Sequence, residues 1–451
     1  MTVGTLSRLA SHAVMAGFAA LFVPYLDGFL EVRGRLLVPV LAVKLFVYAL
    51  VAVSAVTIMG AVLSPRVRAR VIAFYAAHLS VLLPLLVLSG LAFFSGIRGT
   101  AYMDEGPRLV MFPAYWVVVV LLSMLLPLPE HRYKKFRWYL LVAFGVIAAT
   151  VFVDVVDPGT FSLTSDRAAG IATNPNTAAF LLVVLCCAIV SFDEVRPLDL
   201  AVVVVTTLGV LATLSRGGVV MLAVVLLWYG VLVVKSGWRR GTRFALGYAT
   251  ALVLLGAGTY GAMQRLLEQE LFATGTSRIH ILRDRERLFD PQESRIAVAI
   301  TSWNLIRESP LVGYGSGFTY KMPVGPHNIF LSRWLDNGLF GFVTVVWLFG
   351  AMAVTFFRRR SKAGLVFTAV ITLEGFFSHN LFEERVFFLL LGVLLTISYH
   401  ESLERAPTMA LSRQPIRPRI GPGRTDLGGP VRPLGTSKLM VPSFPVRTCV
   451  E

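Results

Sequence analysis

Apolar runs of about twenty residues alternate with short polar connections along most of this chain. A helix that crosses a membrane needs about 20 mainly apolar residues, so each run of this length is a candidate span. Twelve such runs can be drawn, at about 8–26, 36–62, 70–96, 108–128, 136–156, 176–192, 198–214, 217–235, 243–262, 327–357, 363–377 and 385–399. The pattern predicts an all-α, polytopic integral membrane protein with about 12 transmembrane helices.

The composition excludes a soluble globular protein. Hydrophobic residues make up 56% of the chain and charged residues only 15%, whereas soluble domains average about 45–50% and about 25%. Lipid must therefore solvate the surplus apolar surface. No small-x-small cleavage site follows the first run, so we expect a retained span and not a signal peptide. Cys186 and Cys187 lie inside an apolar run and are expected to be buried filler, because no disulfide or zinc pattern includes them.

The distribution of charge predicts the orientation of the chain. A net charge of +16 would suggest a nucleic-acid partner in a soluble protein. Here Lys and Arg concentrate in alternate connections, such as 132–137 and 358–362. The positive-inside rule then places both termini in the cytoplasm. We expect a multi-pass protein of the cytoplasmic (inner) membrane that contacts membrane lipids and binds no nucleic acid.

Three segments interrupt the pattern of short connections, and one of them, 154–175, is expected to be a shorter outer loop. Residues 263–326 form a long outer loop between the ninth and tenth spans, and a loop of this length is usually functional or disordered. Within it, six residues recur at helical spacing and predict an amphipathic helix near the outer membrane surface; they are Arg295, Ile296, Ala299, Ile300, Trp303 and Ile306. Residues 405–451 are rich in Pro, Gly and Arg and predict a disordered cytoplasmic tail, which leaves 1–404 as the transmembrane domain.

Arg216 is the first candidate for chemistry. It lies in the sequence Ser215-Arg216-Gly217-Gly218, a turn so short that the flanking helices form a tight hairpin with its tip at the outer interface. A guanidinium there lies at the depth of a lipid phosphate and offers the planar donor geometry that phosphate oxygens match. The alternative is an interfacial anchor whose charged end reaches into water.

His327 is the second candidate. It precedes the tenth span and follows the glycine-rich sequence from Gly313 to Gly317, which we interpret as a flexible turn leading into that span. An imidazole can accept a proton near neutral pH, as a base that activates a hydroxyl must. The alternative is an amphipathic histidine at the membrane interface. Asp336 lies nine residues further on, over two helical turns away, so direct contact with His327 is not expected.

These residues resemble a known family. The sequence His327-Asn328, nine residues, then Gly338-Leu339-Phe340-Gly341 resembles the signature of O-antigen ligases, and the region from about 167 to 399 resembles the core of the O-antigen ligase and polymerase superfamily. Supporting matches are Arg167 to Gly170, Asn174-Pro175-Asn176, Ser215-Arg216-Gly217, Arg295 to Trp303, Ser309-Pro310-Leu311 and Gly313-x-Gly315. Phe342 departs from the ligase signature, and this leaves open whether the protein is a ligase or a polymerase.

The resemblance implies an activity and a set of site residues. Such enzymes transfer a glycan from an undecaprenyl-pyrophosphate carrier to an acceptor hydroxyl, on a lipid or a glycan, at the extracytoplasmic face, without nucleotide, metal or other cofactor. By resemblance, Arg216 would hold the donor pyrophosphate and His327 would be the base. Fixed cations can stabilise the leaving diphosphate in place of a metal, with inversion at the anomeric carbon. The further substrate-binding candidates are Arg295, Arg167, Asn174, Asn176, Asn328 and Gly315.

Several alternatives stay open at this stage. Asn174 and Asn176 could equally cap a helix. A second group in the last outer loop could be a solvated turn; it comprises His379, Glu383, Glu384 and Arg385. For the whole chain, a polymerase that extends lipid-linked repeat units is the alternative within the same chemistry. A lipid-linked glycan flippase or transporter is the alternative of another class, but its charges would lie at the middle depth of the membrane and not at the ends of the spans.

Overall fold

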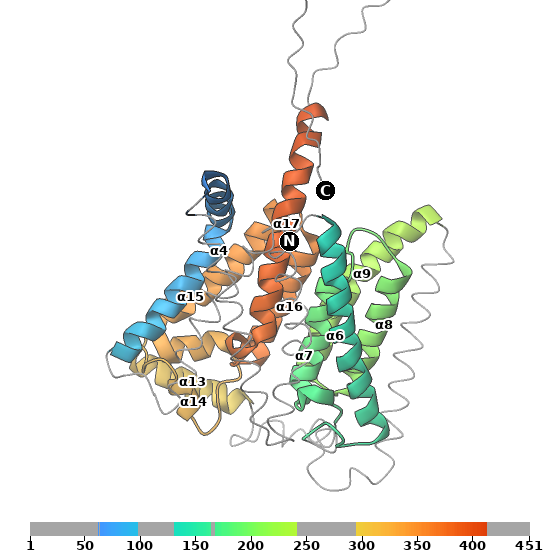
Figure 1. Cartoon of the computed structure of the whole chain (residues 1–451). Helices are drawn as coiled ribbons and strands as arrows, with labels where there is room; N and C mark the ends of the chain where they lie inside the picture. Colours follow the sequence, from blue (N-terminus) through green and yellow to red (C-terminus); the bar gives the residue numbers. More distant parts are fainter. Residues whose placement is uncertain (1–61, 63, 98–129, 164–166, 241–294, 413–451) are drawn as a thin grey trace, which may run out of the picture. The chain divides into compact units, whose positions relative to one another are not determined.

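The structure is a computed structural model that describes residues 62, 64–97, 130–163, 167–240 and 295–412 (Figure 1). This part of the chain contains helices and connections without any β-strand, which confirms the predicted all-α class. The helices are α4 (Pro65–Ile97), α6 (Glu130–Val156), η2 (Gly170–Ala172), α7 (Pro175–Ile189), α8 (Pro197–Ala212), α9 (Arg216–Arg240), α13 (Arg295–Glu308), α14 (Phe318–Lys321), α15 (Ile329–Arg358), α16 (Lys362–Phe377), η4 (Leu381–Glu383) and α17 (Arg385–Ser412).

The described helices coincide with eight of the predicted spans. Five of them, α4, α6, α9, α15 and α17, are long and apolar enough to cross a membrane, and α7 and α8 are shorter apolar helices. The predicted spans at 8–26, 108–128 and 243–262, and all but the end of 36–62, lie outside the described residues. The total of twelve and the position of the long loop therefore stay predictions.

The predicted helix in the long loop is present as α13. Its apolar residues are covered unevenly, since Ile306 is buried while Ile300 and Trp303 are about half exposed. Residues 263–294 lie outside the described part of the chain. The chain divides into two compact units, Met1–Arg405 and Ala406–Glu451. Helix α17 ends at Ser412, and the disorder predicted for the tail falls on residues 413–451, outside the described part.

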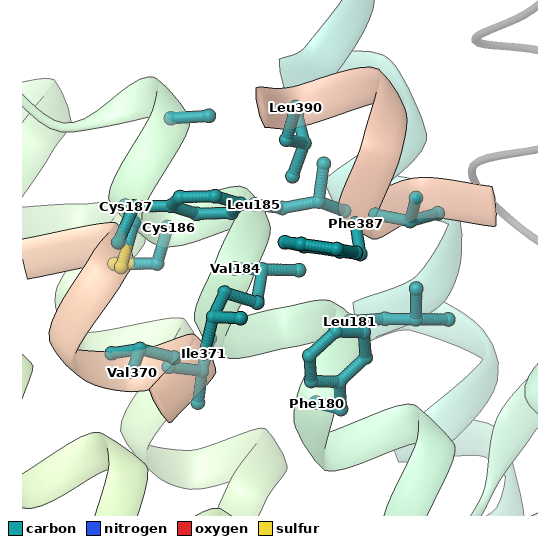
Figure 2. Packing of buried hydrophobic residues seen from close by; sticks show 14 of the residues in the cluster. Phe180, Leu181, Val184, Leu185, Cys186, Cys187, Val370, Ile371, Phe387 and Leu390 are labelled. Carbon is teal, nitrogen blue, oxygen red and sulfur yellow. The ribbon is translucent and has the colours of Figure 1, made fainter. Parts of the chain in front are cut away.

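Helix α7 is the centre of the hydrophobic core. Every residue from Ala178 to Ile189 is buried, as expected for a helix that is apolar on all sides. Figure 2 shows side chains of α7 packing against Val370 and Ile371 of α16 and against Phe387 and Leu390 of α17. The two cysteines, free and fully buried on α7, are the apolar filler that the sequence predicts. This rigid centre fixes the positions of the helix ends that carry the candidate site.

Polar side chains join neighbouring helices at the start of α6 and at the end of α15. Arg137 of α6 forms an ion pair with the buried Asp199 of α8. Arg359, at the end of α15, donates to Nε2 of His78 on α4 over 2.7 Å and to the carbonyl of Leu395 on α17 over 3.0 Å. Arg359 therefore has structural partners in addition to its place in the cluster of positive charges that predicts orientation.

Helix α15 is broken within its length, at a position the sequence does not predict. Asn337 and Gly338 leave helical geometry, with φ of −125° and 64°. The carbonyls of Leu335 and Asp336 lose their helical partners there and instead accept the amides of Tyr314, over 2.8 Å, and Gly315, over 2.9 Å. The glycine-rich turn expected to be flexible is thus hydrogen-bonded onto the break in α15.

This docking explains the spacing of the glycines. A side chain at Gly338 would overlap the backbone of Leu311, and a side chain at Gly341 would overlap the carbonyl of Arg333. Gly338 also needs a positive φ, which side chains other than that of Gly rarely allow. Gly338 is therefore required for close packing of the backbone against Leu311 and Val312, and Gly341 for close packing of the two halves of α15 at the break.

Candidate active site

A buried carboxylate organises the loop that carries Arg167. Asp154, near the end of α6, accepts the backbone amides of Phe161 over 2.7 Å, Ala169 over 3.1 Å and Gly170 over 2.7 Å. Gly170, with φ of 56°, lies so close to α6 that a side chain would meet Thr150. The loop is fixed at both ends, which determines where Arg167 lies.

Arg167 joins this loop to the ends of two other helices. Its Nε donates to the carbonyl of Thr213 over 2.9 Å, and its Nη2 donates to Oδ1 of Asn176 over 3.1 Å. The same Oδ1 accepts the hydroxyl of Ser215 over 3.0 Å. The structure thus brings together three of the sequence elements predicted for the site, namely Arg167, Asn176 and the Ser215-Arg216 turn.

Asn174 has the helix-capping role that was left open. Its Oδ1 accepts the amide of Asn176 over 2.9 Å, and Pro175 occupies the first turn of α7, where a missing amide proton costs nothing. Asn176 has a different role, since its side chain bonds Arg167 and Ser215 and leaves the helix start to Asn174.

Arg216 is the first residue of α9 and is exposed. No hydrogen bond or ion pair holds its guanidinium among the residues that the structure describes, so its donors are available to a ligand. The two glycines that follow allow close packing: a side chain at Gly218 would meet Cβ of Ala179 at 2.5 Å, and one at Gly217 would meet Cβ of Phe377 at 3.4 Å. The N-terminus of α9 is therefore held against α7 and the end of α16.

His327 lies directly before α15 with an unusual backbone conformation. Its φ of 46° falls in the left-handed region, which costs free energy for a residue with a side chain. The next residue, Asn328, is the N-cap, and its Oδ1 accepts the amides of Phe330 over 2.9 Å and Leu331 over 3.1 Å. Asn328, a predicted substrate-binding residue, thus uses its side-chain oxygen to begin α15.

His379 faces His327 across the start of α15. The two ring centroids lie 5.3 Å apart with the planes at 77°, an edge-to-face arrangement. Burial, followed by the charges of His327 and Arg333, lowers the pKa of His379 to about 4. His379 is therefore neutral near pH 7 and is packed against the site, in contrast to the solvated turn that was the alternative.

The end of α16 connects the two candidate groups. Gly217, beside Arg216, packs against Phe377, and His379, two residues further along the chain, packs against His327. Arg216 and His327 thus lie at the same end of α16 although they are far apart in the sequence. An imidazole and a guanidinium thus lie at one end of the bundle, and groups of these two kinds can take up a proton and stabilise an anion.

Backbone strain is concentrated at the same end. Four described residues other than glycine have a positive φ, and three of them adjoin the site: Thr173 (58°) precedes Asn174, Leu214 (51°) precedes the Ser215-Arg216 turn, and His327 (46°) is a candidate itself. Residues held in sparsely populated conformations cluster at functional sites because surrounding structure must stabilise them. This clustering is independent of the sequence motifs, and it falls at the same end of α16 as Arg216 and His327.

The described contacts do not join Gly315, a predicted site residue, to this cluster, and they do not join Asp336 to His327. The amide of Gly315 bonds the break in α15, and Asp336 accepts the amide of Thr319 over 3.0 Å and forms a 3.3 Å ion pair with Arg333. Asp336 does not orient His327, in agreement with the expectation from spacing. Arg295 begins α13, and its side chain lies outside the described part of the structure. Among the described residues, no group of three or more His, Cys, Asp or Glu side chains could hold a metal.

Sequence reasoning missed Asp154 and Arg333. Both are charged residues inside predicted spans, where an ionised side chain is costly and usually has a function. That signal was present in the sequence, but the more conspicuous motifs lie at the ends of the spans.

Comparisons with known proteins agree with the resemblance. A family model described as O-antigen ligase matches residues 201–346, which include Arg216, Arg295, Gly315 and His327. The O-antigen ligase of Salmonella typhimurium (strain LT2) is 27% identical over 164 residues, which are 32% of this chain and 36% of that relative. The match thus spans about a third of the relative's length. The predicted resemblance to the O-antigen ligase superfamily is confirmed, and with its apolar helices the chain is an integral membrane protein.

Proposed function

We propose that this protein transfers a glycan from an undecaprenyl-pyrophosphate carrier to an acceptor hydroxyl at the extracytoplasmic face of the cytoplasmic membrane. The observation that carries the proposal is the exposed guanidinium of Arg216 at the same end of α16 as the strained His327. The proposal includes about twelve spans with both termini in the cytoplasm, a long outer loop between the ninth and tenth spans, and a cytoplasmic tail.

Arg216 would stabilise the diphosphate of the carrier. The N-terminus of α9 carries the positive end of the helix dipole and first-turn amides that favour an anion. Arg216 adds a full charge and donors in a planar fork that matches phosphate oxygens. Arg167 donates to Thr213 and Asn176, so it would support the turn that presents Arg216, with Asn174 holding the start of α7. Arg295 would add a second positive contact.

His327 would act as the base. Its imidazole takes the proton of the acceptor hydroxyl while the hydroxyl oxygen attacks the anomeric carbon of the donor sugar. The bond from that carbon to the phosphate oxygen breaks, and the electron pair leaves with undecaprenyl pyrophosphate, whose charge Arg216 stabilises. A single displacement inverts the anomeric carbon. Asn328 and Gly315 would act through the backbone, by fixing the start of α15 and its break.

The proposed chemistry uses no metal or other cofactor, because fixed cations replace the metal at the leaving group. We propose a ligase ahead of a polymerase, since the family model and the Salmonella relative are both described as O-antigen ligase. Phe342, which departs from the ligase signature, packs its ring against Trp334 with centroids 4.7 Å apart and so has a packing role.

Deletion of the gene tests the class of reaction. Long glycan chains that accumulate unattached on their carrier support a ligase. Single repeat units on the carrier support a polymerase instead. Lipid-linked glycan that accumulates only on the cytoplasmic side of the membrane contradicts both and supports a flippase or transporter.

Variants of the two candidate residues test the mechanism. Arg216→Ala and His327→Ala should abolish transfer at normal abundance, and Arg216→Lys should lose most activity because an ammonium lacks the bidentate fork. The matched control is Arg307→Ala, which removes an exposed arginine of α13 and should leave transfer unchanged. Full product from either Arg216→Ala or His327→Ala contradicts the role given to that residue.

A further inference from the structure

Three buried polar atoms beside His379 have no hydrogen-bond partner among the described residues. They are Oη of Tyr320, Nε of Arg333 and Oδ1 of Asn380. The rings of Tyr320 and His379 have centroids 6.3 Å apart, and Asn380 follows His379 in the chain. A buried donor or acceptor without a partner costs free energy, so native proteins rarely gather several of them unless a ligand or water completes the bonds.

These atoms come from three separate elements. Tyr320 lies on α14, Arg333 on α15, and Asn380 directly before η4. Arg333 lies over the ring of Phe382 in η4, with its guanidinium carbon 5.5 Å from the ring centroid. The three atoms are thus gathered around His379, whose ring contacts His327.

The charge of the cluster favours a neutral ligand. The guanidinium of Arg333 already has an anionic partner, because its Nη1 lies 3.3 Å from the buried carboxylate of Asp336. What remains is one N–H donor, one hydroxyl that can donate or accept, and one amide oxygen that accepts. This mixture suits sugar hydroxyls, which both donate and accept, better than a diphosphate, which only accepts. The aromatic ring of Tyr320 gives such a ligand apolar surface.

We propose that Tyr320, Arg333 and Asn380 form a sugar-binding subsite beside His327. The subsite binds hydroxyl groups of the glycan, and the diphosphate lies separately at Arg216. The proposal rests on the proposed function, and it adds what the Arg216 site lacks, a means to distinguish a carrier with sugar from the bare carrier. Sugar hydroxyls can come from the donor or from the acceptor, and the test below separates these sources.

Conservative variants remove single atoms of the subsite. Tyr320→Phe removes only Oη. Arg333→Lys keeps a positive charge near Asp336 but removes the Nε–H, so the buried carboxylate keeps a partner. The matched control is Tyr229→Phe, which removes a buried hydroxyl on α9 about 20 Å along the helix from Arg216, at 1.5 Å per residue.

The test compares two probes on the full chain purified in detergent. One probe is the lipid-linked glycan extracted from the deletion strain, and the other is undecaprenyl pyrophosphate without sugar. Tyr320→Phe and Arg333→Lys should bind the glycan-linked carrier roughly tenfold more weakly, the loss expected for one hydrogen bond. They should bind the bare carrier as the unmodified protein does. Tyr229→Phe should change neither affinity.

The acceptor is tested in the transfer reaction with membranes of the deletion strain. If Tyr320→Phe and Arg333→Lys bind the donor normally but have a KM for the acceptor that is raised roughly tenfold, the subsite binds the acceptor sugar. Unchanged donor affinity together with an unchanged acceptor KM overturns the subsite, and so does an equal loss for the bare carrier. Arg216→Ala should weaken both carrier probes. If it does not, the proposed diphosphate site fails while the result for the sugar subsite stands.

Discussion

At the scale of single residues, the site depends on polar side chains that bind backbone atoms. Asp154 accepts three amides of the loop that leads to Arg167, and Arg167 in turn donates to Thr213 and Asn176. A carboxylate has two oxygens with about four acceptor positions, so one buried side chain can hold a whole loop. The position of Arg216 thus depends on residues that need not touch substrate.

Asp154→Asn tests this dependence. An asparagine has one acceptor oxygen, so at least one of the three amides loses its partner, and the free energy of unfolding should fall by about 1–3 kcal/mol. Transfer should fall several-fold while abundance is maintained. Asp157→Asn is the control, because Asp157 is exposed and its carboxylate accepts the nearby hydroxyl of Thr160 over 2.6 Å at the surface of the same loop. Equal stability and activity in the two variants would refute the positioning role of Asp154.

His379 gives a prediction about pH. Burial lowers its pKa to about 4 from its ordinary value of 6.5, so the folded protein keeps this ring neutral while the unfolded chain takes up a proton below about pH 6.5. Stability is therefore lost as pH falls from about 6.5 towards 4 and is unaffected above that range. His379→Asn should reduce the fall in Tm between pH 7 and pH 5. An unchanged fall in Tm would show that His379 does not contribute.

At the scale of elements, the break in α15 is the feature on which the loop around the site depends. The break frees the carbonyls of Leu335 and Asp336, and the amides of the turn from Gly313 to Gly317 bond to them. This turn leads to α14 and then to His327. The glycines of the break therefore fix the path of the chain into the start of α15.

Two glycines of α15 should respond to Ala substitution with opposite signs. Gly338→Ala forces a side chain into positive φ and into the backbone of Leu311, so it should destabilise the protein by more than about 1 kcal/mol. Gly350 has open space around it within the helix, so Gly350→Ala should stabilise the protein by about 0.5–1 kcal/mol. Thermal unfolding in detergent measures both. A Gly338→Ala protein as stable as Gly350→Ala would show that the docked turn is not needed.

The sequence predicts the helices of this protein better than their contacts. Apolar runs predict eight described helices because lipid imposes length and composition on each one separately. The break at Asn337 and Gly338 could not be predicted, since it depends on a backbone that docks from elsewhere in the chain. The motifs name Arg167, Asn176 and Arg216 in order, but only the folded chain shows that the first two hold the turn carrying the third.

At the scale of the whole molecule, the proposal requires every part of the site to lie at the extracytoplasmic face of the membrane. Val324, in the connection before His327, is about half exposed, and Asp193, between α7 and α8, is also exposed. The positive-inside rule assigns these positions to opposite faces of the membrane. Figure 1 shows both connections within the described chain.

Cysteine labelling tests this sidedness. In a Cys449→Ser background the remaining cysteines are buried on α7 and should not react. Val324→Cys should be labelled by a membrane-impermeant maleimide in intact cells, and Asp193→Cys only after permeabilisation. The reverse pattern would move the proposed site to the cytoplasmic face and contradict the orientation.

Arg216 and His327 are proposed to serve one substrate, and a cryo-electron microscopy map of the full chain with bound undecaprenyl pyrophosphate is the decisive test. Diphosphate density should lie within hydrogen-bonding distance of the Arg216 guanidinium, with His327 lining the same site. A diphosphate bound elsewhere, or one that contacts Arg216 while His327 faces a separate part of the protein, would contradict the account.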